Sequence, residues 1–178
     1  MPRNIEIKAR VADPDALEAR AASLSGRGPD LIEQDDTFFH CPSGRLKLRD
    51  FGNGSGELIF YRRADASGPK TSFYRITPSD RPDELRETLG AALGKLGRVR
   101  KLRRLYMIGR TRVHLDRVEG LGDFMELEVV LGADEEEASG AHEAEQLIKQ
   151  LGIQGEDLVE QAYVDLLATI DRLRSGDS

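Results

Sequence analysis

Asn4-Ile5-Glu6-Ile7-Lys8-Ala9-Arg10-Val11 has apolar residues at its odd positions and polar or charged residues at its even positions. A period of two is typical of a β-strand, because successive side chains of a strand point to opposite faces. The predicted strand therefore has one apolar face, and its other face carries Asn4, Glu6, Lys8 and Arg10. A single strand of this kind can lie at a protein surface with its charges in water.

The same alternation recurs in four later stretches. Each has a charge at every second position and apolar residues between the charges. The stretches are Arg45-Leu46-Lys47-Leu48-Arg49, Lys101-Leu102-Arg103, Arg112-Val113-His114-Leu115-Asp116 and Glu126-Leu127-Glu128-Val129. Five strands that are each charged on one face and apolar on the other indicate a sheet whose charged faces meet one another.

The size and composition of the chain indicate one globular domain. The chain has 178 residues, of which 39% are hydrophobic, and this is enough to form a core. We expect a single domain over residues 1–174 and a frayed tail over residues 175–178. No apolar run approaches the roughly 18 residues of a membrane helix, and Met1-Pro2-Arg3 leads directly into the first strand. We therefore expect a cytoplasmic protein without a membrane span or a signal peptide, and the single Cys41 fits a reducing compartment.

The net charge of −6 is unevenly distributed. Residues 98–112 include seven basic residues and no acidic one, whereas residues 116–160 include fourteen acidic residues and two basic ones. A basic segment can bind nucleic acid, but Lys101 and Arg103 share one face of a strand while Arg100 and Arg104 point the other way. We therefore do not expect a nucleic-acid duplex as a partner.

Two helices are predicted in the N-terminal half of the chain. Asp13-Pro14 is a typical helix start, and Gly26 is a typical helix end. The second helix is predicted from Pro82 to Leu96. The residues expected on the buried faces are Leu17, Ala21 and Leu24 in the first helix and Leu85, Leu89, Ala92 and Leu96 in the second.

Two further helices are predicted near the C-terminus. Asp134 is expected to cap the first of them, followed by an acidic first turn over residues 135–137, and Gly152 is expected to end it. The expected apolar positions are Leu147, Ile148 and Leu151 in this helix and Leu158, Ala162, Leu166 and Leu173 in the last one.

The remaining segments have strand patterns and are separated by turns rich in Gly, Pro, Ser and Asn. They cover residues 34–41, 45–49, 57–63, 70–76, 99–107, 110–118 and 124–131, which makes eight strands with the first. Eight antiparallel strands joined by short turns can close into a barrel. The predicted fold is therefore α+β: an eight-stranded antiparallel β-barrel, closed or nearly closed, with a charged interior and flanking helices.

A charged interior implies a ligand. Burying charges is costly unless they are paired, bound to metal or in contact with water. Guanidinium and ammonium groups pair with phosphate oxygens, and carboxylates hold Mg²⁺ or Mn²⁺ that bridges to the same phosphates. The inward basic residues are Lys8, Arg10, Arg45, Lys47, Arg49, Lys101 and Arg103, with Arg63, Lys70 and Arg112 as further candidates, and the inward acidic residues are Glu6, Asp116, Glu126 and Glu128. This set suits a triphosphate, and the alternative is a web of internal salt bridges without a ligand.

These blocks resemble the CYTH, or triphosphate tunnel metalloenzyme, superfamily, which includes class IV adenylyl cyclases, thiamine triphosphatases, and inorganic and RNA triphosphatases. The first strand resembles the Glu-x-Glu-x-Lys signature of the family: Glu6 and Lys8 match it, and Asn4 replaces its first Glu. The other blocks that match in order are residues 44–49, 68–70, 99–103, 114–116 and 121–128.

The resemblance implies roles for the residues that match. Asn4, Glu6 and Lys8 are candidate catalytic residues, and the neutral oxygen of Asn4 implies a weaker second metal site. His114 is a candidate proton carrier or an interior hydrogen-bonding residue. Glu6, Asp116, Glu126 and Glu128 would bind Mg²⁺ or Mn²⁺, and the phosphates would be bound by Lys8, Arg10, Arg45, Lys47, Arg49, Arg63, Lys70, Lys101 and Arg103.

Three functions fit this resemblance. The first is a metal-dependent triphosphatase, and the second is a class IV-like adenylyl cyclase that makes cyclic AMP and pyrophosphate from ATP. The third is a triphosphate-binding module with little turnover. We favour hydrolysis, because water is always available as a nucleophile whereas cyclisation also requires the base and ribose to be held in one orientation. The expected partner is a small-molecule triphosphate, and the sequence indicates neither which one nor the oligomeric state.

Overall fold

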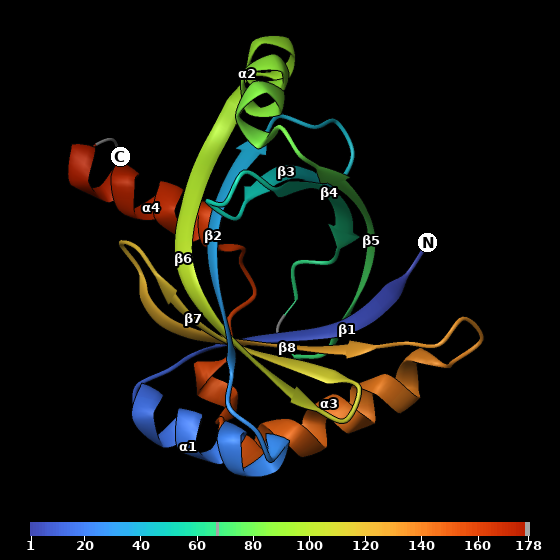
Figure 1. The fold of residues 1–178 in the computed structure, drawn as a ribbon. Coiled ribbons are helices and arrows are strands. Elements are labelled where there is room, and N and C mark those ends of the chain that lie inside the picture. The colour runs from blue at the N-terminus through green and yellow to red at the C-terminus, as the bar shows by residue number, and fades with distance from the viewer. Residues whose placement is uncertain (67, 177–178) are drawn as a thin grey trace.

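The computed structural model describes residues 1–66 and 68–176, and within these residues eight antiparallel strands form one closed barrel. Figure 1 shows the ring of strands with helices below it, above it and at one side. The strands are β1 (Arg3–Arg10), β2 (Asp30–Phe39), β3 (Arg45–Asp50), β4 (Gly56–Arg63), β5 (Lys70–Ser79), β6 (Lys95–Ile108), β7 (Thr111–Val118) and β8 (Gly122–Val130). Their order around the barrel is β1-β5-β4-β3-β2-β6-β7-β8. The predicted barrel is confirmed, although β2 and β6 each begin earlier than predicted.

The helices cover different parts of the barrel. α1 (Pro14–Ser25) and α3 (Glu137–Leu151) lie side by side below the ring, and α2 (Pro82–Leu93) lies above it in Figure 1. A 3-10 turn (Gly155–Asp157) and α4 (Tyr163–Ser175) end the described chain. None of the described helices is long and apolar enough to cross a membrane.

The main hydrophobic core lies outside the barrel, between its wall and the helices α1 and α3. Ile5 and Ile7 from the odd face of β1 are buried in it, together with Leu17 of α1 and Leu147 of α3. Because the odd face of β1 packs into this core, its even face points into the barrel. The alternation in residues 4–11 therefore places the charged side chains inside, as predicted.

The first helix agrees with the prediction more closely than the second. The Asp13 carboxylate accepts a hydrogen bond from the Ala16 backbone N–H, and Gly26 ends α1 in the left-handed conformation. Leu17 and Ala21 are buried, but Leu24 is 38% exposed. In α2 the predicted buried stripe, Leu85, Leu89, Ala92 and Leu96, is wrong: Pro82 is the buried residue of this helix, and Leu96 belongs to β6 and is exposed. α2 packs against β2 and β3 outside the ring (Figure 1), where Leu85 and Leu89 are only half-buried and Ala92 is exposed.

The C-terminal helices begin later than predicted. α3 starts at Glu137 with Glu136 at its N-cap, so the predicted Asp134 cap is wrong. Leu158 and Ala162 precede α4, and Leu173 is 78% exposed, so they do not form one helical face with Leu166. The segment between α3 and α4 is extended because it pairs with β1: Leu158 bridges to Ala9, and the Val159 N–H donates to the Lys8 carbonyl. α4 continues through Ser175, so the tail predicted over 175–178 begins inside a helix, and residues 177–178 lie outside the described residues.

Candidate active site

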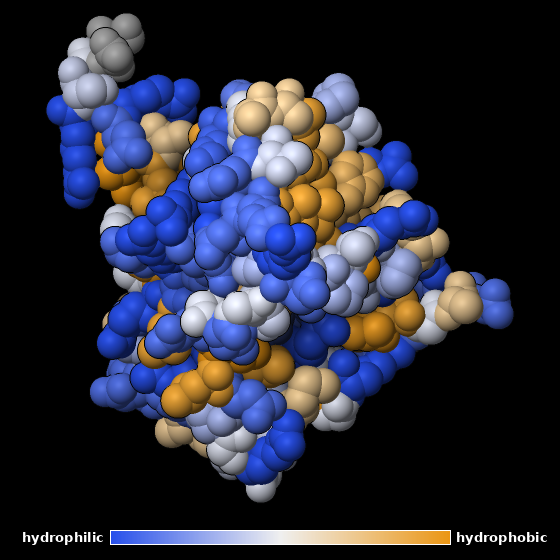
Figure 2. Space-filling model, turned by 45° about the horizontal axis from the view of Figure 1, so that its top comes forward, coloured by the Kyte–Doolittle hydropathy of each residue, from blue (hydrophilic) through white to orange (hydrophobic). Residues whose placement is uncertain are grey.

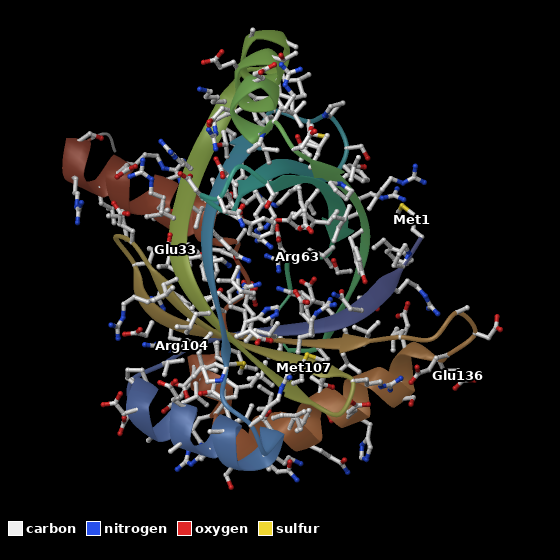
Figure 3. All side chains as sticks on the ribbon, viewed as in Figure 1. Met1, Glu33, Arg63, Arg104, Met107 and Glu136 are labelled. Carbon is white, nitrogen blue, oxygen red and sulfur yellow. The ribbon has the colours of Figure 1, made fainter. Side chains whose placement is uncertain are left out.

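The barrel encloses a cavity of about 380 Å³ that is lined by inward-facing side chains from all eight strands. This volume lies within the range of small-molecule sites, roughly 300–1,000 Å³. One end is closed by Phe38, Val99 and Phe124, which pack against Ala162 and Tyr163 where the chain enters α4. In Figure 3 Arg63 lies among the side chains that point into the ring.

Seven cationic side chains of the described residues line this cavity. They are Lys8, Lys47, Arg49, Arg63, Lys101, Arg103 and Arg112, all of which were predicted to point inward. They come from β1, β3, β4, β6 and β7, so the positive charge surrounds the space from several sides. Their arrangement can bind an anion that carries several negative oxygens.

Three other predicted phosphate ligands lie elsewhere. Arg10 is exposed, with its guanidinium 5.0 Å from the centroid of the Phe124 ring. Arg45 pairs with Asp165 at 2.6 Å and lines a neighbouring cavity. Lys70 donates to the backbone carbonyls of Ala66 and Glu160. These three residues have the predicted strand parity, but they lie near or beyond the closed end of the barrel, so the structure does not bring them into the main cavity.

The cations are held by carboxylates, and one of these was missed from the sequence. Asp36 of β2 is buried and accepts hydrogen bonds from Lys47 at 2.8 Å and from Arg49 at 2.8 Å. Burial alone would raise the pKa of Asp36, but Arg49 and Lys47 outweigh it and hold the pKa well below its usual range. Asp36 therefore keeps two cations at fixed positions without a ligand. Asp36 alternates with Gln34 and Phe38 along the strand, so all three side chains share one face, and this spacing could have identified Asp36 as inward-facing.

Asp116 of β7 has the same role for Lys101 and Arg103. Its Oδ1 accepts from Arg103 Nε at 2.7 Å, and its Oδ2 accepts from Lys101 Nζ at 2.8 Å and from the Tyr163 hydroxyl at 3.1 Å. Burial acts to raise the pKa of Asp116, but Arg103 and Lys101 lower it well below its usual range. Asp116 lies behind the described residues that line the cavity, with its oxygens occupied by these donors. The structure thus places it as an ion-pair partner rather than beside the other expected metal ligands.

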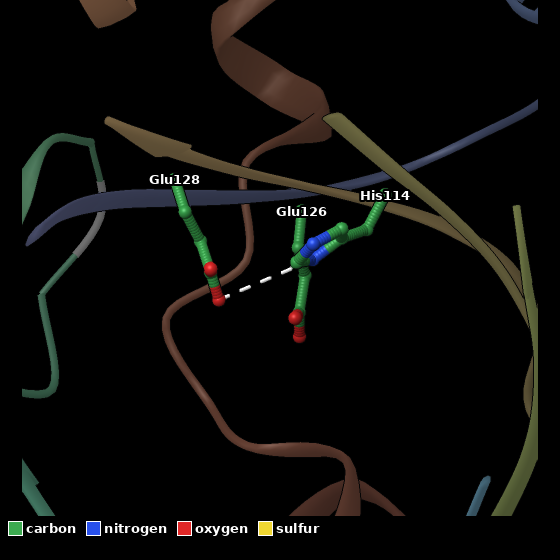
Figure 4. A group of neighbouring side chains, drawn as sticks. All are labelled: His114, Glu126 and Glu128. Atoms are coloured by element: carbon green, nitrogen blue, oxygen red, sulfur yellow. Dashed lines mark ion pairs between the residues drawn. The ribbon is translucent and has the colours of Figure 1, made fainter. Parts of the chain in front are cut away.

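Glu126 and Glu128 do meet, and a third donor joins them. One ligand atom from each of His114, Glu126 and Glu128 lies within 4.8 Å of the others (Figure 4). His114 Nδ1 is 4.0 Å from Glu128 Oε1 and has no hydrogen-bond partner among the described residues. Burial lowers the pKa of His114 to about 3, which keeps the imidazole neutral at pH 7. Two carboxylates and a neutral imidazole fit a divalent metal ion, and the unpartnered nitrogen would gain a bond to it.

Glu6 and Asn4 lie beside this cluster on β1. Glu6 is directly opposite Glu128 in the β1–β8 register, and it pairs with Arg63 at 3.0 Å. Burial, and then the Glu128 charge, raise the pKa of Glu6 above its usual value. Asn4 is buried, and its side-chain oxygen has no hydrogen-bond partner within residues 1–66 and 68–176. A polar oxygen in this state can accept a donor or a metal bond from a ligand.

Lys8 links the metal cluster to the closed end. Its Nζ is 3.2 Å from Glu126 Oε1, donates to the Gln161 carbonyl, and lies 3.9 Å from the centroid of the Tyr163 ring. Lys101 Nζ lies 4.7 Å from the same ring. Burial lowers the pKa of Lys8 to about 8. The ring of Tyr163 therefore contacts two cations, Lys8 and Lys101. The sequence did not reveal this role, because this segment was predicted to belong to a helix.

Lys47 implies a pH limit for anion binding. Burial, and then the Arg49 charge, lower the pKa of free Lys47 to about 8. A bound phosphate would favour the charged lysine and raise this pKa. Below about pH 8 Lys47 stays protonated, so its titration should not change the affinity for tripolyphosphate. Above about pH 8 Lys47 loses its proton, and the affinity should fall as the pH rises. Calorimetry between pH 7 and pH 9.5 would measure this, and Lys47→Arg, which stays charged, should reduce the slope. An unchanged slope in Lys47→Arg would assign the pH dependence to another group.

Comparisons with known proteins identify a family and related structures. A family model for the CYTH domain matches residues 2–163. The chain is 24% identical over 174 residues to adenylate cyclase CyaB of Aeromonas hydrophila, and the match covers 89% of this chain and 85% of that protein. The structure of the PH1012 protein from Pyrococcus horikoshii OT3 matches with a TM-score of 0.78 and 25% identity, covering 92% of this chain and 98% of that one. A conserved hypothetical protein from Pyrococcus furiosus matches with a TM-score of 0.79 and 20% identity, covering 92% and 99%.

The family match begins before the Glu6–Lys8 strand and ends at Tyr163, so it includes the whole barrel and the residue that closes it. It also includes the seven cations and the His114, Glu126 and Glu128 cluster. This chain belongs to the CYTH family.

Proposed function

We propose that this protein is a metal-dependent triphosphatase, which binds a nucleoside, organic or inorganic triphosphate and transfers its terminal phosphoryl group to water. The observation that carries this proposal is one cavity in which seven cationic side chains surround the cluster of His114, Glu126 and Glu128. A triphosphate needs both features: cations that bind its oxygens, and carboxylates that hold a metal ion against the same oxygens.

The cations are positioned before the substrate arrives. Arg49 is held by Asp36, and Arg103 is held by Asp116 and Glu126. Arg49 gives two of its five N–H donors to Asp36, which leaves others for phosphate oxygens. Fixed donors of this kind stabilise the charge that develops on a transferring phosphoryl group, because they need little rearrangement during the reaction.

His114, Glu126 and Glu128 would hold the metal ion, with Glu6 and Asn4 next to them on β1. A bound Mg²⁺ or Mn²⁺ would neutralise phosphate charge and make a bound water more acidic. Glu6, whose pKa is raised mainly by burial, would take a proton from an attacking water in this proposal. Lys8, 3.2 Å from Glu126, is placed to bind the phosphate oxygen next to the metal.

Adenylyl cyclase activity is the second candidate, and the name of the Aeromonas hydrophila relative favours it. Both reactions start from the same bound triphosphate, so the products distinguish them. Incubation with Mg²⁺ or Mn²⁺ and ATP, GTP, thiamine triphosphate or tripolyphosphate is expected to release orthophosphate. Pyrophosphate together with cyclic AMP would support the cyclase instead. Stabilisation against heat by these compounds without any product would support a binding module, and no response at all would contradict a triphosphate site.

Asn4→Glu is expected to raise turnover severalfold at limiting Mn²⁺ and to leave triphosphate affinity nearly unchanged. Position 4 shares the inward face of β1 with Glu6, so a carboxylate there would add a charged oxygen ligand beside the metal. Steady-state kinetics over a Mn²⁺ titration would measure the effect, with Asn4→Gln as the neutral control. If turnover is already high in the natural protein and falls in Asn4→Glu, Asn4 is the adapted residue.

His114→Asn should weaken binding of Mn²⁺ about tenfold or more and change binding of Mg²⁺ much less. An imidazole nitrogen is a good ligand for Mn²⁺ and later first-row ions, whereas Mg²⁺ prefers oxygen ligands. Calorimetric titration with each ion would compare the two, and His142→Asn on the outer surface of α3 is the matched control. Equal losses for both ions would mean that His114 supports the site without binding the metal itself.

A further inference from the structure

The open end of the cavity is apolar on one side and polar on the other. Five apolar side chains line it: Ile32 of β2, Phe51 directly after β3, Ile59 of β4, Ile76 of β5 and Leu105 of β6. These strands are consecutive around the barrel, in the order β5-β4-β3-β2-β6. We call these five residues the apolar wall. The remaining strands β7, β8 and β1 carry Arg112, Glu128 and Asn4 at this end.

Strand register places part of the apolar wall beside the cations and the rest further toward the open end: Ile59 pairs with Lys47, and Phe51 lies two residues after Arg49. Ile32 pairs with Arg103, and Leu105 is the next inward residue of β6 after Arg103. On the other side of the wall, Ile59 and Ile76 are direct cross-strand partners. A phosphate chain bound by the cations would therefore point its outer end at the apolar wall.

The apolar wall lies outside the two clustered hydrophobic cores, although Ile59 itself is buried. Its five members are absent from both core clusters that the described residues form. Ile76 is 45% exposed. Figure 2, which turns the top of the molecule forward, shows hydrophobic residues reaching the surface in the upper half of the view. Apolar surface that lines a cavity and remains open to water is typical of a ligand site rather than of a structural core.

The charge on the apolar wall disfavours further phosphates. Glu57 of β4 lies at this end, opposite Arg49 in the β3–β4 register, and no hydrogen bond or ion pair of the Glu57 carboxylate occurs in the described part of the chain. A carboxylate among apolar side chains repels a polyanion, but it tolerates a neutral or cationic organic group. Tyr61 and Tyr74, which also line the cavity and face each other across β4 and β5, offer flat aromatic surfaces nearby.

We propose that the apolar wall binds the organic part of the substrate, so that the substrate is a small triphosphate ester with a planar ring system, such as a nucleoside triphosphate, rather than an inorganic triphosphate. The inference rests on the proposed function, because it assigns the phosphates to the cations deeper in the cavity. It applies to hydrolysis and to cyclisation alike.

The test compares ATP with inorganic tripolyphosphate in the presence of Mn²⁺. Apparent dissociation constants are obtained from the rise in melting temperature with ligand concentration, which requires no turnover. In the natural protein, ATP is expected to bind at least tenfold more tightly than tripolyphosphate. Ile76→Asn should weaken ATP about tenfold, within the range for changes in an apolar pocket, and should leave tripolyphosphate within twofold. Leu31→Asn, an exposed position on the outward face of β2, is the control and should change neither.

Tripolyphosphate binding as tightly as ATP to the natural protein would overturn the inference and leave the proposed function standing. Equal weakening of both ligands by Ile76→Asn would also overturn it, because the apolar wall would then support the cavity as a whole. If neither ligand raises the melting temperature, the proposed function itself fails.

Discussion

Changing Glu126 and Glu128 together to Gln is expected to abolish metal-dependent binding of tripolyphosphate, with a loss of at least about a hundredfold in affinity. The two carboxylates are alternate residues of β8 and face the same side, where they meet His114. The amides keep the size of the side chains but remove the negative charge that a hard divalent cation requires. The neutral imidazole of His114 would then be the remaining metal ligand of this cluster.

Calorimetry should show the loss in two steps: Mn²⁺ binding disappears, and tripolyphosphate then binds equally weakly with and without Mn²⁺. Glu57→Gln is the matched control for the metal: Glu57 lines the same cavity outside the metal cluster, so this variant should still bind Mn²⁺ and should keep the Mn²⁺ dependence of tripolyphosphate binding. Circular dichroism would verify that the double variant is folded. Unchanged binding of metal and tripolyphosphate by the folded double variant would remove this pair from the site.

The barrel could be predicted because strand parity is a local property. The alternation in residues 4–11 recurs in β3, β6, β7 and β8, so the sequence alone indicated which face of each strand is charged. Parity correctly placed Lys8, Lys47 and Arg103 inside. The alternation follows from the sequence of each strand alone, so this part of the prediction did not need to know which strands are neighbours.

Depth along the barrel could not be predicted in the same way. Arg10, Arg45 and Lys70 have the correct parity, but their depth depends on register and on the position of the segment that closes the barrel. That segment, residues 158–163, looked like one face of a helix because Leu158 and Ala162 are four residues apart. Leu158 and Val159 instead pair with β1, and α4 begins only at Tyr163. This tertiary pairing has no local signal.

The sequence also concealed the apolar half of the cavity. Ile59 lies in the apolar run Leu58-Ile59-Phe60, and Ile32 directly follows Leu31, so both look like residues that pack into a core. Only the closed barrel shows that their side chains face the same space as Lys47 and Arg103. His114 was recognised as inward-facing, but its approach to Glu126 and Glu128 requires the β7–β8 register, which pairs it with Glu126.

Asp116→Asn is expected to lower the free energy of unfolding by about 3–5 kcal/mol, the usual cost of breaking a buried ion pair on one side. The Asp116 side chain is fully buried and neutralises Lys101 and Arg103, whose side chains are 3% and 6% exposed. A charged group that lines a wet tunnel usually adds little to a core, but Arg103 also contributes to folding, since Arg103 and Asp116 form two buried hydrogen bonds with each other.

Urea unfolding at pH 7 measures the effect, and Asp35→Asn is the control. Asp35 pairs with Arg98 on the outer surface of β2, where an ion pair contributes about 0–1 kcal/mol. The alternative role of Asp116 as a metal ligand makes a different prediction. If Asp116→Asn is as stable as the natural protein but no longer binds Mn²⁺, Asp116 must reach the metal through a rearrangement of Lys101 and Arg103. If Asp116→Asn is less stable but its folded fraction binds Mn²⁺ normally, Asp116 only positions those two cations. Metal binding would then depend on His114, Glu126 and Glu128.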